Sequence, residues 1–179
     1  IKCYAIPEAG RNAKGLPIVN LLQLGEGEKV TAMFPVEGEG TEGYLVMATK
    51  NGVIKKTPVS ALQNIRKGGL IVQNLPEGDS LIAVEYSNGE DEFIVASRKG
   101  RCVRFAEDDV RPMGRTATGV RSMNLDEDDE VVDMVKAQKD GYVLTVTELG
   151  MGKRTPEEQY PLHHRGGKGV IAATLTEKT

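Results

Sequence analysis

Lysine and arginine residues recur at two fixed places along this sequence, each time close to glycine. The first place follows a tight turn and holds Lys55 and Lys56, Arg101 and Arg104, and Lys153 and Arg154. The second is a glycine-rich loop further along, which holds Arg11 and Lys14, Arg66 and Lys67, Arg115 and Arg121, and Arg165 and Lys168. Ammonium and guanidinium groups make charge-assisted hydrogen bonds to phosphate, and glycine lets a backbone approach it closely. These residue types therefore favour recognition of a polyanion.

The glycine-rich loops are four versions of one element: Asn12–Gly15, Ile65–Gly69, Arg115–Gly119 and Arg165–Gly169. None is a nucleotide-binding P-loop, because that motif ends in Lys followed by Ser or Thr, whereas Lys168 is followed by Gly169. A loop between strands also lacks a helix N-terminus to hold a terminal phosphate. We therefore expect a polyanion backbone to contact the basic residues named above together with His164, Gly166, Gly167 and Gly169.

The loops recur because the chain is written as a repeat of about 50 residues, a period typical of propellers, solenoids and arrays. Hairpin turns recur at Lys50–Gly52, Arg98–Gly100 and Glu148–Gly150. Acidic turns recur at Leu24–Glu28, Leu75–Asp79 and Leu125–Asp129. Each repeat holds four short apolar, β-branched runs, and four strands in a unit of this length indicate a propeller blade.

The repeat predicts an all-β, propeller-like fold with strands at equivalent places. We expect first strands at 30–34, 81–86 and 131–135, second strands at 44–49, 93–97 and 142–147, third strands at 53–57, 101–105 and 152–155, and fourth strands at 18–19, 70–72, 120–123 and 170–172. We expect one partial domain over 1–179, with repeats at about 1–29, 30–80, 81–130 and 131–179. We also expect the chain to be a fragment of a longer protein.

The charge distribution supports the polyanion hypothesis more than the net charge of −3 does. Acidic residues collect in the turn after the fourth strand, and most densely over Asp126–Glu130. If the repeats rotate about an axis, two basic stripes run close together and the acidic stripe lies elsewhere. Such separation of charge is typical of a surface that binds a polyanion. The alternative is that the cations only protect strand edges against aggregation.

Other classes of site find little support. His163 and His164 are adjacent and lack a metal-ligand partner at suitable spacing, and Asp126–Glu130 lacks the oxygen pattern of a calcium loop. No nucleophile motif is present, so we expect no catalytic residue, metal or cofactor. Cys3 and Cys102 occupy different repeat positions, which predicts buried free thiols in a reducing compartment. No apolar run is long enough for a bilayer, so we expect a cytoplasmic chain with no membrane partner.

Four stretches carry a family resemblance: Ile6–Ala9, Gly15–Leu22, Arg111–Val120 and Gly152–Pro156. They resemble the C-terminal domain of DNA gyrase A, part of a type IIA DNA topoisomerase. The resemblance implies a β-pinwheel of six four-stranded blades that exchange strands, with a basic rim around which duplex DNA wraps. It implies double-stranded DNA, the rest of gyrase A and, through it, gyrase B as partners. It also implies a monomeric, nucleoid-associated, non-catalytic fragment, with ATP and Mg²⁺ held by other parts of the enzyme.

The resemblance has two departures. The family's signature loop, similar to Gln-Arg-Arg-Gly-Gly-Lys-Gly, belongs to the first blade, and His163–Gly169 resembles it in a later blade. The chain also has no match to the cleavage tyrosine region, the acidic metal cluster or the ATPase, so we expect it to bind or bend DNA and not to supercoil it alone. The alternatives are the corresponding domain of topoisomerase IV and a propeller scaffold whose rim binds an acidic protein.

Overall fold

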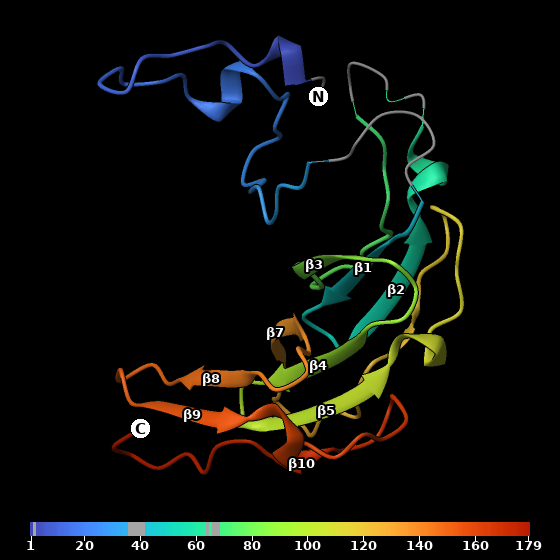
Figure 1. Ribbon diagram of the computed structural model, residues 1–179, viewed down its shortest axis with the longest axis vertical. Helices are drawn as coiled ribbons and strands as arrows, with labels where there is room; N and C mark the ends of the chain where they lie inside the picture. The colour runs from blue at the N-terminus through green and yellow to red at the C-terminus, as the bar shows by residue number, and fades with distance from the viewer. Residues whose placement is uncertain (2, 36–41, 64, 66–68) are drawn as a thin grey trace.

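The computed structural model describes residues 1, 3–35, 42–63, 65 and 69–179, and this part of the chain is all-β (Figure 1). Its sheets follow one another along a bent path from the blue N-terminal segment to the red C-terminus. Short 3₁₀ turns connect them at η1 (Cys3–Ala5), η2 (Ile18–Asn20), η3 (Val59–Leu62), η4 (Glu107–Asp109) and η5 (Glu157–Gln159). Within the described ranges, no helix has the length and apolarity needed to span a membrane.

Three antiparallel sheets make up the described part of the fold. The first has the order β3-β1-β2-β6, from β1 (Tyr44–Thr49), β2 (Val53–Pro58), β3 (Leu81–Ser87) and β6 (Val120–Arg121). The second has the order β10-β5-β4-β7, from β4 (Glu92–Ser97), β5 (Arg101–Ala106), β7 (Val131–Lys136) and β10 (Val170–Ile171). The third is a hairpin of β8 (Tyr142–Val146) and β9 (Gly152–Pro156). The hairpin turns lie where the sequence predicts them.

Each four-stranded sheet takes its strands from two consecutive repeats. The β1–β2 hairpin pairs on one side with β3, the first strand of the next repeat, where Met47 faces Val84. On the other side it pairs with β6, the fourth strand of that same next repeat, where Ile54 faces Val120. The second sheet follows the same rule with β7 and β10. A contiguous repeat therefore does not form a sheet alone, and the strand exchange implied by the family resemblance is present.

Three predicted strands are absent from the described chain, at 30–34, 18–19 and 70–72. Because an unpaired strand leaves its backbone N–H and C=O groups without partners, these segments take other conformations, and Ile18–Asn20 forms η2. Met33 is 84% exposed for the same reason.

The main core lies between the first two sheets. Val46, Val95 and Met134 are fully buried there, and the rings of Phe93 and Phe105 pack at a centroid distance of 6.5 Å. Cys102 is buried in a smaller cluster with Ile94, Tyr160 and Ala172. The prediction of a buried free thiol is right for Cys102 and wrong for Cys3, which is exposed because the segment before residue 36 packs little against the sheets.

Candidate nucleic-acid interface

Two glycines let the basic loops pack directly against the backbone of the neighbouring hairpins. Gly119 precedes β6 and Gly169 precedes β10, both with positive φ. A Cβ at Gly169 would lie 1.9 Å from the carbonyl oxygen of Cys102, and one at Gly119 would lie 2.7 Å from that of Ile54. Only glycine fits such close contact in this conformation. The sequence suggested close approach to phosphate, but at these two glycines the close approach is to the neighbouring strand.

The segment 72–74, which follows the second glycine-rich loop in the sequence, is held by hydrogen bonds to the loop of the third repeat. The Lys55 Nζ donates to the carbonyl oxygens of Val72 and Arg115, each at 2.6 Å. Gln73 Nε2 donates to the carbonyl oxygen of Thr118 at 2.8 Å, and Asn74 Nδ2 to that of Thr116 at 2.7 Å. Carbonyl groups of Arg115–Thr118 are therefore turned inward and satisfied by the neighbouring repeats.

The loop of the fourth repeat is fastened to the segment that follows the third loop. Arg165 Nη1 donates to the carbonyl oxygen of Arg121 at 3.1 Å, and the Gly166 amide donates to that of Ser122 at 2.6 Å. Arg165 Nε also donates to the carbonyl oxygen of Asp109 at 2.8 Å, and His164 Nδ1 lies 3.0 Å from the Asp109 carboxylate. Segment 72–74 and the loops of the third and fourth repeats are thus connected in one row. We call Arg115, Arg121, His164, Arg165 and Lys168 the basic loop row.

The predicted contact residues differ in accessibility. Arg66 and Lys67 lie outside the described residues. Exposed are Arg11, Lys14, Arg121, Lys153, Arg154, His164, Gly167 and Lys168. Half-buried are Arg101, Arg104, Arg115, Arg165, Gly166 and Gly169. Lys55 and Lys56 are buried.

Three predicted contact residues are structural in this fold. Lys55 is 0% exposed, and burial lowers the pKa of its ammonium group. Lys56 is also buried and pairs with Glu107, while Arg104 pairs with Glu92 and Glu157. A buried cation that already has partners cannot reach a phosphate, so the expectation that Lys55 and Lys56 contact a polyanion is corrected, while the half-buried Arg104 is already paired with two carboxylates. Burial is set by the loops of later repeats, which no local pattern reveals.

Lys153 and Arg154 occupy the same repeat positions as these buried cations. They lie on β9, which no later loop covers in this chain, and the Arg154 guanidinium stacks on the Tyr142 ring at 4.2 Å. Their exposure is therefore a property of β9, over which no described loop packs. It is no argument for a ligand.

The acidic turns lie against the hairpin turns and the basic loops, which corrects the expectation of a separate acidic stripe. Asp79 accepts a hydrogen bond from the Asn51 amide at 2.9 Å, and Asp129 accepts one from the Lys99 amide at 2.9 Å. Lys50 Nζ lies 2.9 Å from a Glu130 oxygen. These acids stabilise the turn of the preceding hairpin, a contact between repeats that linear spacing does not show.

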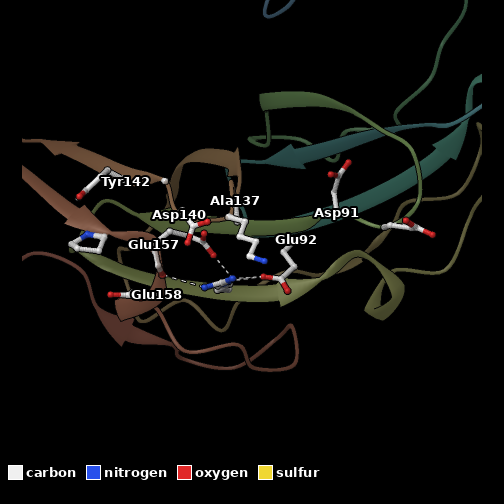
Figure 2. Close-up of a pocket in the computed structure, with 12 residues that line it drawn as sticks. Asp91, Glu92, Ala137, Asp140, Tyr142, Glu157 and Glu158 are labelled. Carbon is white, nitrogen blue, oxygen red and sulfur yellow. Dashed lines mark hydrogen bonds and ion pairs between the residues drawn. The ribbon is translucent and has the colours of Figure 1, made fainter.

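A cleft of about 660 Å³ lies between the second sheet and the β8–β9 hairpin. Figure 2 shows Glu92 and Glu157 directed toward the guanidinium group between them, which is that of Arg104. Acids dominate its lining, including Glu90, Asp91, Asp140 and Glu158. This lining repels phosphate, so the cleft is not the polyanion site. Among the described residues, no cluster of three or more His, Cys, Asp or Glu side chains could hold a metal ion.

The family assignment follows from the sequence model described as "DNA gyrase C-terminal domain, beta-propeller", which matches residues 1–37, 43–88, 91–138 and 141–178. The chain belongs to this family. Gyrase A from Klebsiella oxytoca is 48% identical over 179 residues, covering 99% of the chain. The chain spans 20% of the length of that relative.

Solved structures agree with membership of the gyrase C-terminal domain family. A gyrase A C-terminal domain superposes with a TM-score of 0.80 at 28% identity, covering 93% of this chain and 56% of that one. The C-terminal domain of DNA topoisomerase IV superposes with a TM-score of 0.83 at 27% identity, covering 88% and 49%. Both folds match, but the sequence is closer to gyrase A, so the topoisomerase IV alternative fits less well.

Proposed function

We propose that this chain binds and wraps duplex DNA through the basic loop row, as the C-terminal part of gyrase A. The observation that carries the proposal is the side-by-side fastening of the loops by Lys55, Gln73 and Arg165. This connection between loops supports joint action of cations from successive repeats on a continuous phosphate backbone. Family membership supports the same conclusion.

The contacts should be to phosphates and carry little base specificity. Arg and Lys dominate the row, and the side-chain amides of Gln73 and Asn74, which lie next to it, already donate to carbonyl groups. Sequence preference then arises from the energy of bending DNA, which depends on the base steps that are bent. A tight consensus motif from an unbiased selection would contradict this.

In the whole enzyme, wrapped DNA would be presented to the rest of gyrase A and, through it, to gyrase B. The chain would thereby support ATP-dependent negative supercoiling in the bacterial cytoplasm without catalysing it. The gyrase A relatives, of which this chain spans about a fifth, support this context.

The proposal is tested by binding duplex DNA of increasing length across a salt series. Replacing Arg115, Arg121 and Lys168 with Gln should weaken binding and flatten the slope of log affinity against log salt by about 0.9 per contact, or roughly 2 to 3 in all. The matched control replaces Lys29, Lys139 and Lys178, which are exposed cations outside the row, and changes the net charge equally.

The control should leave the slope within experimental error. A wrapping surface should also gain affinity with DNA length until the row is covered. Equal slopes for the two triple variants, or weak binding at every length, would overturn the proposal and favour the propeller-type protein scaffold.

A further inference from the structure

The carboxylate of Asp126 lies between two cations of the interface that belong to different repeats. One oxygen is 2.5 Å from Lys168 Nζ, and the other is 3.9 Å from Arg101 Nε. The side chains of Asp126 and Lys168 are 39% and 57% exposed, so a second anion can reach this place from solvent. The two cations could therefore bind a phosphate, but in this structure the Asp126 carboxylate already lies between them.

This arrangement occurs once in the sequence. Asp126 stands where the other acidic turns have Gly25 and Pro76, and Lys168 stands where the preceding loop has Thr118. An acid at this turn position and a lysine at this position of the following loop therefore occur together at one place in the sequence. Asp126 is also unlike Asp129, whose carboxylate binds the turn amides of Lys99 and Glu130. The Asp126 carboxylate is not needed to shape the turn.

We propose that Asp126 competes with DNA phosphate for Lys168 and Arg101, and so lowers the affinity of the fourth basic loop. This inference rests on the proposed function. A phosphate entering between the two cations displaces the carboxylate into solvent, and DNA leaving lets it return. Exposed ion pairs are weak, so the competition is easily reversed and should change affinity by about two- to fivefold.

The salt dependence should report the same competition. While Asp126 shares Lys168, the lysine neutralises a phosphate only in part, so fewer of the cations condensed on the DNA are released. Removing the carboxylate lets Lys168 neutralise the phosphate fully, so the slope of log affinity against log salt should steepen by up to about 0.9. A general change in net charge would not single out one lysine.

The experiment measures duplex DNA binding by the 179-residue chain with Asp126→Asn, Asp128→Asn and each of these combined with Lys168→Gln. Asp128 is the matched control because it is exposed in the same turn and its φ of 58° is one that Asn also adopts. Asp126→Asn should bind about two- to fivefold more tightly with a steeper salt slope. Asp128→Asn should bind as the parent does, and Asp126→Asn should gain nothing when Lys168 is Gln.

Three results would overturn the competition. They are equal gains from the two Asn variants, a persisting gain in the Lys168→Gln background, and weaker binding by Asp126→Asn, which would mean that the carboxylate positions Lys168 for DNA. In each case the parent chain still binds DNA, and the proposed function stands. Absence of length-dependent DNA binding by the parent and all variants would overturn both proposals.

Discussion

The ammonium group of Lys56 and the carboxylate of Glu107 form a buried ion pair between consecutive repeats, with Nζ 3.4 Å from Oε1. Nζ also donates to the carbonyl oxygen of Glu107 at 3.3 Å. Arg104 and Glu157 repeat both contacts one repeat later, where Nη1 donates to the Glu157 carbonyl oxygen at 3.1 Å. The pair is therefore an element of the repeat that joins one hairpin to the next 3₁₀ turn.

One repeat earlier in the sequence, both the cation and the acid of this pair are replaced by uncharged residues. Cys3 stands in the cation position, and Val59, the first residue of η3, stands in the acid position. Neither side chain is charged, so no buried charge is left without a partner. This agrees with the large cost of burying an unpaired charge.

We expect Glu107→Ala to lower the free energy of unfolding by about 3–5 kcal/mol, because it leaves Lys56 buried and uncompensated. Urea unfolding of the chain measures the change. The double variant Lys56→Met, Glu107→Leu should recover part of the loss, since it removes both charges together but leaves the Ser87 hydroxyl and the Asp91 amide without the acceptor that Glu107 supplies. A cost below about 1 kcal/mol for Glu107→Ala would contradict a buried, paired role.

Lys55→Met should loosen the loops without removing an exposed cation. The carbonyl oxygens of Val72 and Arg115 lose their shared donor, which should cost about 1–3 kcal/mol of stability. Hydrogen exchange should quicken at the amides of the Arg115–Gly119 loop, and DNA affinity should fall. Lys153→Met, at the equivalent but exposed position, should change stability by no more than about 0.5 kcal/mol.

Gly169→Ala should detach the fourth loop from β5. The new Cβ meets the Cys102 carbonyl oxygen, and φ at this residue is +67°, so we expect a loss of more than about 1 kcal/mol and weaker DNA binding. Gly167→Ala is the control, because the nearest atoms would lie 3.9 Å from its Cβ. Thermal unfolding compares the two variants. Equal melting temperatures would show that the close contact at Gly169 does not hold the loop against β5.

Cys102 should make stability fall as pH rises above about 9. Burial raises the pKa of its thiol from 9.0 to about 11. The unfolded chain therefore loses its thiol proton first, and the folded state should lose about 2 kcal/mol relative to it by pH 11. Denaturant unfolding of the parent and of Cys102→Ala measures this, since other groups titrate alike in both. Parallel pH curves would refute the assignment.

Much of the fold could be predicted from local pattern. Asn51–Gly52 marks a hairpin turn by its backbone preferences, and the apolar runs on either side of it form β1 and β2 as expected. The site was less accessible to sequence reasoning. Asp109 and Gln73 hold the basic loops through partners in other repeats, and nothing in their own neighbourhoods marks them for that role.

The repeat, the strand-forming segments and the positions of the cations can all be read from the amino-acid order, because each depends on short-range periodicity and turn chemistry. Three-dimensional packing is needed to know which hairpin each strand joins, and therefore that Lys55 is enclosed while Lys168 faces solvent beside Asp126. A pattern of period two shows that a segment is a strand but carries no information on its partner. Burial of a charge depends on that partner, since desolvation is imposed by whichever repeat packs over it.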